Sequence, residues 1–398
     1  MKFYSTKDRT KTVSLEYAVL RGLADDCGLF MPVNIPQLPK QFFSESRKMS
    51  FQEIAYRVAK NFFQPTLAFK DFAARFMSQL MSYFVRNSDK ELTILVATSG
   101  DTGSAVAHGF YNIPGIKVII LYPSKKVSLL QEKQIATLDG NITVLEIRGT
   151  FDDCQRLVKQ AFMDPDLQNK LWLTSANSIN IARLIPQSFY YFYAFSKIED
   201  SGKSVVFSVP SGNFGNLTGG ILAKKMGLPV DKFVAATNAN DVIPKYLSSG
   251  RFHPQPSRRT ISNAMDVGNP SNWARILELF DNDLQKIRQE IFAVSVSEEQ
   301  TRETMNHVFQ QYSYIMDPHT AVGYLGLIKY LSETQNQTCG ISLSTAHPAK
   351  FKDIVEKITG QSITLPERLA TCLKKKNRSI VLSKEFAGFK EFLFETVR

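Results

Sequence analysis

Short apolar runs typical of β-strands alternate with longer runs of helical spacing through the middle of this 398-residue chain. The strand-like runs are rich in β-branched residues and comprise Leu92–Ala97, Lys117–Leu121, Ile142–Ile147, Ser204–Val209 and Gly340–Ser344. Helical spacing occurs between them, for example over Asp152–Phe162 and Leu217–Met226. This alternation predicts an α/β fold with two open, mostly parallel sheets covered by helices.

The length and the hydrophobic content of 43% allow a large core and indicate two domains. We expect a helical N-terminal segment over residues 1–63, which caps an α/β domain over residues 64–200. A larger α/β domain is expected over residues 201–398, with approximate boundaries and with crossing of the chain between domains left open. A helix expected over Ser178–Ile198 contains Pro186, which should kink or split it.

Several classes of protein are disfavoured by composition. No apolar run reaches the length of a membrane span, and the N-terminus has no signal-peptide core. The four cysteines form no Cys-x-x-Cys pair and the five histidines form no His-Glu-x-x-His pattern, so we expect a reduced cytoplasmic protein without a metal. The basic residues behind the net charge of +11 are mostly spread along the chain, and the local cluster Lys374–Arg378 has no interleaved aromatics, which does not support nucleic-acid binding.

One lysine stands among apolar neighbours where a helix is expected to begin. Apolar residues follow helical spacing from Phe69 to Phe84, Thr66 can cap the first turn, and Pro65 stops any earlier helix. At a helix N-terminus, partial positive charge and desolvation both disfavour the ammonium form of Lys70. A neutral lysine can attack a carbonyl and form a Schiff base. Taken alone, however, a solvated surface lysine is the favoured interpretation.

Two turns that follow strand-like runs are suited to anions. The first, Thr98–Gly103, contains Ser99, Asp101 and Thr102, and it either binds a carboxylate or phosphate or is an ordinary capped loop. The second places Gly212, Asn213, Phe214, Gly215 and Asn216 before a helix. It favours a phosphate cradle without nucleotide signatures, although a glycine turn chosen for geometry alone remains an alternative.

A third turn carries Thr345, whose hydroxyl could hydrogen-bond a ring nitrogen, although a helix N-cap is the favoured role for it alone. A potentially activated lysine, an anion-binding turn and a phosphate turn together suggest pyridoxal 5′-phosphate. That cofactor needs an amine partner for its aldehyde, a phosphate cradle and a contact at the pyridine nitrogen, and the chain offers a candidate for each.

Several motifs in one order resemble the threonine synthase family, of the tryptophan-synthase-β-like group of pyridoxal-phosphate enzymes (fold type II). They are Tyr4–Thr6, Gly22–Pro32, Pro65–Asp71, Thr98–Gly103, Asn177–Asn180, Pro210–Asn216 and Thr345–Lys350. The resemblance implies Lys70 as the Schiff-base lysine and residues 212–216 at the cofactor phosphate. It also implies Thr345 at the pyridine nitrogen and Asp101 near the cofactor's 3′-oxygen.

The same resemblance implies conversion of O-phospho-L-homoserine and water to L-threonine and phosphate, by a monomer or homodimer. For substrate binding we expect Ser99, Asp101, Thr102 and Asn177. At the substrate phosphate we favour Arg183 over the alternatives Lys126 and Lys133, because a guanidinium can donate two parallel bonds. The alternatives are another pyridoxal-phosphate eliminase, such as a dehydratase or phospho-lyase, and a non-catalytic sensor of phosphate ligands.

One stretch departs from the family pattern. The family usually has a longer segment before the lysine motif, whereas here Phe63 runs directly into Gln64. Either a loop has been lost from this protein or residues between Phe63 and Gln64 are absent from the sequence. Because the lysine motif itself is intact, catalysis by Lys70 remains compatible with this departure.

Overall fold

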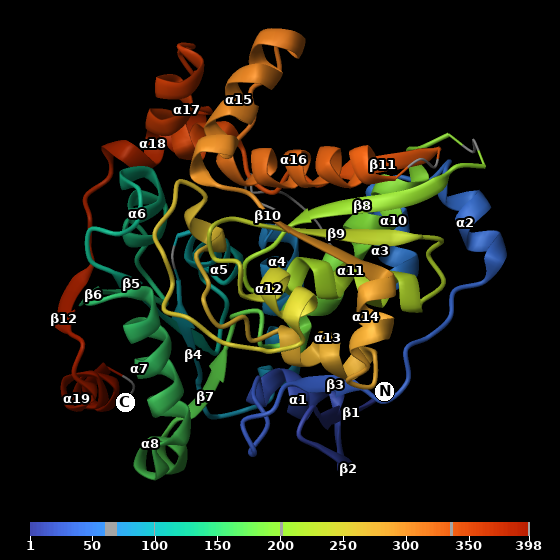
Figure 1. Ribbon diagram of the computed structural model, residues 1–398. Coiled ribbons are helices and arrows are strands. Elements are labelled where there is room, and N and C mark those ends of the chain that lie inside the picture. Colours follow the sequence, from blue (N-terminus) through green and yellow to red (C-terminus); the bar gives the residue numbers. More distant parts are fainter. Residues whose placement is uncertain (60–69, 99, 200–201, 335–336, 397–398) are drawn as a thin grey trace. The chain divides into compact units, whose positions relative to one another are not determined.

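The computed structural model describes residues 1–59, 70–98, 100–199, 202–334 and 337–396, which form two compact units (Figure 1). Among the described residues, unit 1 comprises 1–33, 70–183 and 365–396, and unit 2 comprises 34–59 and 184–364. No helix in these ranges is both long enough and apolar enough to cross a membrane.

Unit 1 is built on a parallel five-stranded sheet with the strand order β12-β6-β5-β4-β7. Its strands are β4 (Leu92–Ala97), β5 (Ile116–Pro123), β6 (Ile142–Arg148), β7 (Trp172–Ser175) and β12 (Ile380–Ser383). Every residue of β4 is buried, which is typical of a central parallel strand covered on both faces. The predicted α/β class with mostly parallel sheets is confirmed.

Helices cover this sheet and connect its strands. They are α1 (Leu15–Arg21), α4 (Lys70–Val85), α5 (Asp101–Gly109), α6 (Leu129–Ala136), α7 (Phe151–Met163), α8 (Pro165–Lys170), α9 (Ile181–Leu184, which ends at the boundary with unit 2), α18 (Glu367–Lys374) and α19 (Phe386–Thr396). Capping boxes begin α6 and α7, where Ser128 and Thr150 accept hydrogen bonds from backbone N–H groups of the first turn.

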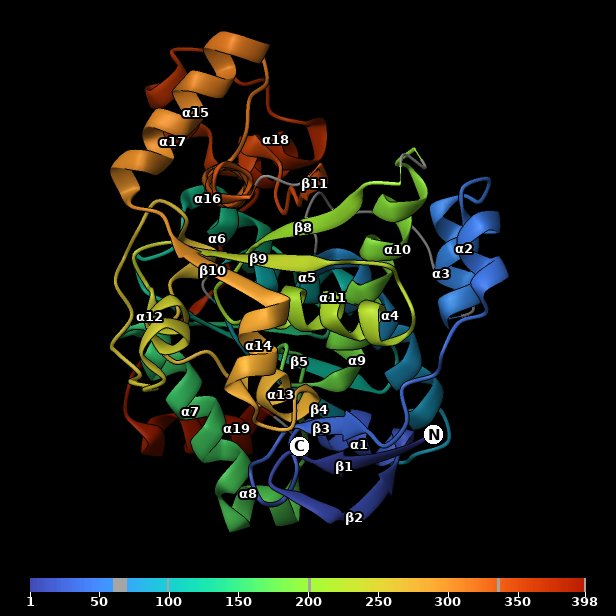
Figure 2. The ribbon, with the colours of Figure 1, turned by 45° about the vertical axis from the view of Figure 1, so that its right-hand side comes forward.

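Unit 2 contains a parallel four-stranded sheet with the order β10-β9-β8-β11. Its strands are β8 (Ser204–Pro210), β9 (Lys232–Thr237), β10 (Ile291–Ser295) and β11 (Thr338–Ser342). A Cβ at Gly220 of α11 (Gly215–Lys225) would meet Phe233, whereas one at Gly326 of α16 (Pro318–Glu333) would meet Val234. Because successive strand residues face opposite sides, α11 and α16 cover opposite faces of the sheet (Figure 2).

The remaining helices of unit 2 surround this sheet. They are α2 (Lys40–Ser46), α3 (Phe51–Ala59), α10 (Ser188–Ser196), α12 (Val242–Ser249), α13 (Trp273–Leu279), α14 (Leu284–Glu290), α15 (Glu298–Tyr312) and α17 (Lys352–Thr359), with 3₁₀ turns η1 (Ile185–Gln187), η2 (Asn263–Met265) and η3 (Pro348–Phe351). The helix expected over residues 178–198 is split at Pro186, as predicted, into α9, η1 and α10.

Two expectations about the N-terminal segment differ from the structure. Residues 1–33 contain the antiparallel strands β1 (Lys2–Ser5), β2 (Asp8–Ser14) and β3 (Phe30–Pro32) besides helix α1, so this part is not purely helical. Residues 34–59 belong to unit 2, where the Leu38 N–H donates to the Met226 carbonyl at 2.9 Å and Phe51 stacks on Tyr190. The expected segment 1–63 is therefore divided between the two units.

The end of the chain also departs from the expected boundaries. Strand β12 pairs with β6, and Phe389 and Leu393 of α19 are buried in the core of unit 1. The expected domain 201–398 therefore ends structurally near residue 364, and residues 365–396 return to unit 1. Burial of apolar side chains against α7 and pairing to the edge of β6 explain this return.

Candidate functional site

Lys70 is the first residue of α4 in unit 1 and its side chain is half-buried. Pro65 and Thr66, which were expected to set the start of this helix, lie outside the described residues. Helix α4 packs closely on α5, since a Cβ at Gly109 would lie 3.2 Å from the carbonyl carbon of Ala74. The lysine therefore begins a helix whose next turn is anchored in the core of unit 1.

The anion-binding turn predicted at residues 98–103 connects β4 to α5. The Thr98 hydroxyl accepts hydrogen bonds from the N–H groups of Gly100 at 2.9 Å and Gly103 at 2.8 Å. Asp101 is buried, and its Oδ1 accepts from Gln131 Nε2 at 3.2 Å. Thr102 is half-buried, and Ser99 lies outside the described residues. The turn is thus held by its own hydroxyl and by helix α6, which carries Gln131.

Gly100 is required in this turn for two reasons. Its φ of 134° lies in a region that favours glycine, and a Cβ there would lie 2.5 Å from the side chain of Gln131. The close approach of Gln131 is what brings its amide to Asp101. The hydrogen bond from Gln131 to Asp101 therefore depends on glycine at position 100. It orients Asp101, which is predicted to bind both the cofactor and the substrate.

Asn177 and Arg183 follow strand β7 in unit 1. The Asn177 side chain accepts from the N–H of Ala97 at 3.2 Å and donates to its carbonyl at 2.7 Å, which extends the pairing between β4 and β7 to the last residue of β4. Arg183 is buried and donates from Nη1 to the carbonyl of Ala176 at 2.7 Å. The structure therefore places the Asn177 side chain at the end of β4 and the Arg183 side chain at the residue that follows β7, each with a backbone partner.

The predicted phosphate turn joins β8 to α11 in unit 2. Phe214 has a φ of 60°, a left-handed conformation that aims the following N–H groups out of the helix end. A Cβ at Gly212 would lie 2.6 Å from the Cα of Met265, so only glycine fits between the turn and η2. The first N–H groups of α11 have no acceptor within the helix, and they can serve an anion.

Two asparagine side chains flank this turn. Asn213 Oδ1 accepts from the Ser271 N–H at 2.7 Å and from the Ser271 hydroxyl at 3.0 Å. Asn216 Oδ1 accepts from the Tyr191 hydroxyl at 2.8 Å, and burial raises the pKa of Tyr191, which keeps this hydroxyl protonated. Asn216 Nδ2 is buried and has no hydrogen-bond partner among the described residues. A buried donor of this kind requires an acceptor, such as a phosphate oxygen.

Thr345 lies after β11 at the same edge of the sheet as the phosphate turn. Strands β11 and β8 are parallel, with Ser342 opposite Ser208, so their carboxyl ends meet at one edge. The favoured N-cap role for Thr345 is wrong, because His347 caps the following turn by accepting from the Ala349 N–H at 3.1 Å. Thr345 is half-buried, and its hydroxyl is not used for capping.

These features of unit 2 fit a ligand that carries both a phosphate and a hydrogen-bonding ring. The turn 211–216 supplies backbone N–H groups, the buried Asn216 amide supplies a donor, and Thr345 supplies a hydroxyl at the same sheet edge. Pyridoxal 5′-phosphate has this combination of groups. The site therefore defines the class of protein as an α/β enzyme that binds this cofactor.

Family models identify the class more closely. The model described as "Pyridoxal-phosphate dependent enzyme" matches residues 58–344. Two further models, "Threonine synthase N terminus" and "Threonine synthase, C-terminal", match residues 2–76 and 320–393. The chain belongs to the threonine synthase family of pyridoxal-phosphate-dependent enzymes.

Individual relatives agree with this assignment. Threonine synthase of Buchnera aphidicola subsp. Schizaphis graminum is 43% identical over 438 aligned positions, which cover 99% of this chain and 100% of the relative. The crystal structure of Escherichia coli threonine synthase is 41% identical, with a TM-score of 0.92 and coverage of 100% of both chains. A structure of Brucella melitensis threonine synthase with bound pyridoxal phosphate is 31% identical, with a TM-score of 0.89 and the same coverage.

Sequence reasoning missed the residues that support the phosphate turn. Tyr191, Ser271 and Met265 hold or limit the turn, and all three lie far from it in sequence. Tyr191 lies in the apolar helix α10, where a fully buried tyrosine needs a partner for its hydroxyl, and this was the available signal. No comparable signal marks Ser271 or Met265.

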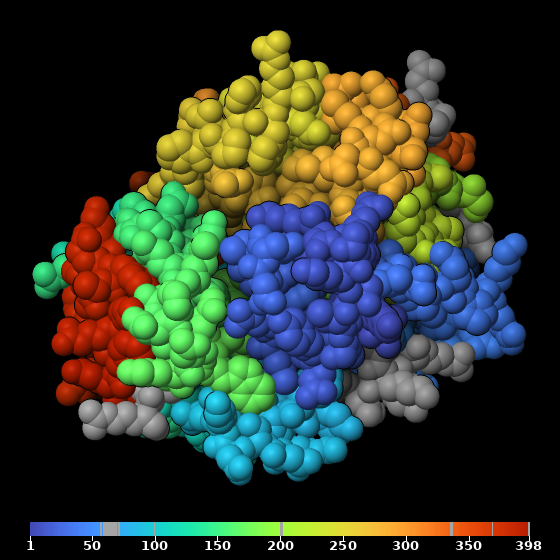
Figure 3. Space-filling view, turned by 90° about the horizontal axis from the view of Figure 1, so that it is seen from below, coloured from blue at the N-terminus to red at the C-terminus, as the bar shows by residue number. Residues whose placement is uncertain are grey.

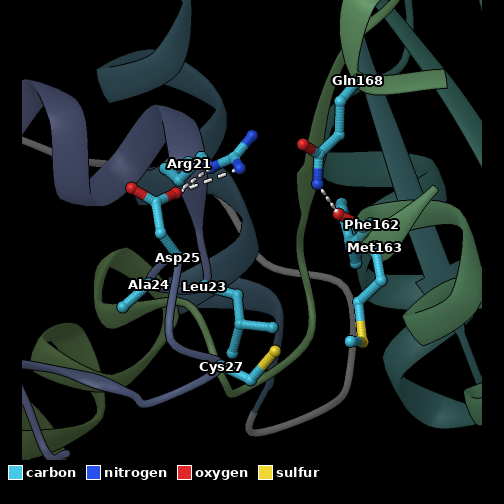
Figure 4. A pocket seen from close by; sticks show the side chains of 8 residues that line it. All are labelled: Arg21, Leu23, Ala24, Asp25, Cys27, Phe162, Met163 and Gln168. Carbon is cyan, nitrogen blue, oxygen red and sulfur yellow. Dashed lines mark hydrogen bonds and ion pairs between the residues drawn. The ribbon is translucent and has the colours of Figure 1, made fainter. Parts of the chain in front are cut away.

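A separate pocket of unit 1 contains none of the predicted site residues. On the surface, the blue N-terminal residues border the green region of α7 and α8 (Figure 3). The lining residues are Arg21, Leu23, Ala24, Asp25, Cys27, Phe162, Met163 and Gln168. Arg21 is paired with Asp25 at 3.0 Å, and Gln168 donates to the carbonyl of Phe162 (Figure 4). Its charged groups are thus already satisfied by neighbours in the pocket wall.

Proposed function

We propose that this chain converts O-phospho-L-homoserine and water to L-threonine and phosphate with pyridoxal 5′-phosphate as cofactor. The observation that carries the proposal is that threonine synthase models match both ends of the chain and a pyridoxal-phosphate enzyme model matches the middle. The buried donor at Asn216 and the glycine-dependent turn before it supply the phosphate site that such an enzyme requires.

The proposed roles in unit 2 concern binding of the cofactor. The N–H groups of residues 212–216 and the Asn216 amide hold the cofactor phosphate, and the Thr345 hydroxyl contacts the pyridine nitrogen. When bound, the cofactor supplies an electron sink that stabilises negative charge on the substrate carbons. A neutral hydroxyl at the ring nitrogen accepts or donates one hydrogen bond without adding charge there.

The proposed roles in unit 1 concern proton transfer and the substrate. Lys70 holds the cofactor before substrate arrives, and its Nζ then removes the α-proton of the substrate. Ser99, Asp101, Thr102 and Asn177 bind the substrate, and Asp101 also lies near the 3′-oxygen of the cofactor. The Asn177 amide retains one N–H beyond its two bonds to Ala97.

Arg183 is proposed as the cation for the substrate phosphate. Its buried side chain is anchored by a hydrogen bond from Nη1 to the Ala176 carbonyl. A guanidinium is planar and can donate two parallel bonds, which suits bidentate binding of a phosphate.

The setting of the enzyme completes the proposal. We propose a cytoplasmic protein that acts as a monomer or homodimer on a small-molecule substrate, without a nucleic-acid partner. The spread of basic residues along the sequence supports the absence of a nucleic-acid partner.

The test combines product analysis with a lysine variant. Purified enzyme given O-phospho-L-homoserine should release equal amounts of phosphate and L-threonine. Lys70→Ala should lower turnover at least about a hundredfold, whereas Lys90→Ala, an exposed lysine of the same unit, should not. Borohydride treatment should fix the cofactor to the peptide that contains Lys70. Release of 2-oxobutyrate and ammonia would indicate the eliminase alternative, and cofactor binding without phosphate release would indicate the sensor.

A further inference from the structure

The N-terminus of α16 contains a buried polar cluster that the proposed function does not use. Asp317, His319 and Thr320 are 0%, 3% and 5% exposed. Asp317 caps the helix and accepts from the His319 N–H at 2.9 Å. Its carboxylate also bonds His319 Nδ1 at 2.7 Å and the hydroxyl of Thr320. One buried carboxylate therefore orients both neighbouring side chains.

His319 connects this cluster to the phosphate turn. The Ala264 N–H donates to His319 Nε2 at 3.1 Å, so Nε2 carries no proton and Nδ1 donates its proton to Asp317. Ala264 and Met265 are the residues that a Cβ at Gly212 would strike, with distances of 3.1 Å to the Ala264 carbonyl oxygen and 2.6 Å to the Met265 Cα. His319 thereby holds the backbone that forms one wall of the phosphate turn.

The same wall is held from its other end by the half-buried carboxylate of Asp266. Asp266 accepts from the Thr260 N–H at 2.9 Å, from the Thr260 hydroxyl at 2.7 Å and from Asn238 Nδ2 at 2.9 Å. Residues 264 and 265 are thus fixed on both sides, and a change at His319 releases only one of the two attachments.

Thr320 connects the cluster to the turn that carries Thr345. The Thr320 hydroxyl lies 3.0 Å from the Ser344 hydroxyl. Since the proton of Thr320 is donated to Asp317, the Ser344 hydroxyl must donate to Thr320. Ser344 directly precedes Thr345, so this bond holds the backbone from which the proposed ring contact projects.

We propose that Asp317, His319 and Thr320 are positioning residues that set the spacing between the phosphate turn and Thr345. His319 acts on the phosphate turn through Ala264 and Met265. Thr320 acts on Thr345 through Ser344. Asp317 couples them because its carboxylate bonds both side chains. The inference rests on the proposed cofactor site, but it concerns residues that touch neither cofactor nor substrate.

The first arm of the test separates positioning from general stability. Thr320→Val removes the hydroxyl at nearly constant volume, and we expect the dissociation constant for pyridoxal phosphate to rise about tenfold, with a shifted visible absorption band. Thr320→Ser keeps the hydroxyl and should restore both. In a Thr345→Val background, Thr320→Val should have no further effect on the band, because the contact that it positions is gone.

The second arm addresses His319 by phosphorus NMR of the bound cofactor. His319→Leu should shift the phosphate resonance, and His319→Gln, whose amide oxygen can accept from Ala264, should leave it close to the wild-type position. The matched control is Thr301→Val in α15, since this hydroxyl is also buried in unit 2 but donates to the carbonyl of Ser297, the N-cap of the same helix. It should lower the melting temperature and leave affinity and both spectra unchanged.

All of these readouts are taken without substrate, so they do not depend on which reaction the enzyme performs. If Thr320→Val and His319→Leu behave as the Thr301→Val control does, the residues are merely structural and the inference is wrong. Additive effects of Thr320→Val and Thr345→Val on the absorption band would also overturn it. Failure of the wild-type chain to bind the cofactor would refute the proposed function itself.

Discussion

Replacement of Gly212 by alanine tests the phosphate turn most directly. The added Cβ would lie 2.6 Å from the Met265 Cα and 3.1 Å from the Ala264 carbonyl oxygen, and both neighbours are backbone atoms that cannot rotate away. The Ala264 N–H is bonded to His319 and the Ser211 N–H to the carbonyl of Ala236 at 2.8 Å, so both sides of the contact are anchored. Either the turn or η2 must move.

The size of the effect follows from the nature of this clash. Inserting one methyl group into a well-packed site costs about 1–3 kcal/mol. If the turn moves to relieve the clash, cofactor affinity falls by the corresponding factor, which is about 5- to 150-fold because 1.4 kcal/mol is tenfold. If η2 moves instead, the cost appears as a lower free energy of unfolding at unchanged affinity.

Equilibrium dialysis or fluorescence titration with pyridoxal phosphate measures the first outcome, and urea unfolding of the apoenzyme measures the second. The control is Gly388→Ala, an exposed position in α19 where a Cβ would meet nothing within 4 Å. That change should raise stability by about 0.5–1 kcal/mol, as expected for glycine in a helix. Unchanged cofactor affinity and unchanged stability in Gly212→Ala would refute the reasoning.

Substitutions at three further positions have expected outcomes. Burial raises the pKa of Asp266 to about 6, so its stabilising contribution is greatest below pH 4 and is lost as the pH rises through 6. Wild type should therefore lose roughly 2 kcal/mol relative to Asp266→Asn between pH 4 and pH 7 in urea unfolding, and a flat difference would contradict this. Tyr191→Phe leaves the Asn216 amide oxygen without its donor and should cost about 1–3 kcal/mol of stability and weaken cofactor binding, measured by unfolding and titration. Asn177→Ala removes two bonds to the backbone of Ala97 and should lower the melting temperature. Asn177→Asp should keep only the bond that the Ala97 N–H donates to the side chain of residue 177.

Elements with strong periodicity could be predicted closely from the sequence. Strand β4 has the predicted bounds Leu92–Ala97, and helix α4 was predicted within one residue at each end. Fully buried parallel strands are continuous apolar runs, and an amphipathic helix repeats its apolar residues every three or four positions. The split at Pro186 was predictable because proline lacks the N–H that a continuous helix needs.

Short or exposed elements could not be predicted in this way. Strand β12 has four residues, of which three are exposed, so its composition does not separate it from a loop. Strand β2 is polar and largely exposed, and its pairing with β1 is formed by backbone groups. Such strands are stabilised by their partners in the sheet, and those partners lie elsewhere in the sequence.

In the candidate site, too, some residues could be predicted from the local sequence and others could not. The turn at residues 211–216 was recognisable because glycines and asparagines follow a strand and precede a helix. The supports of this turn at Met265, Ser271 and His319 were not recognisable, because their roles depend on tertiary contacts rather than on local pattern. Local chemistry identifies residues that can touch a ligand, whereas the residues that orient them require the fold.

The position of α16 explains why the unit 2 contacts form a rigid set. Gly326 lets this helix approach β9 so closely that a Cβ would lie 2.6 Å from the Ala236 side chain, and the Ser208 hydroxyl of β8 donates to the Gly323 carbonyl at 2.6 Å. The helix N-terminus with Asp317 is therefore fixed relative to the strand ends that carry the phosphate turn and Thr345. The conformational entropy of these site residues is therefore lost when the protein folds. Little more of it has to be lost when the cofactor binds.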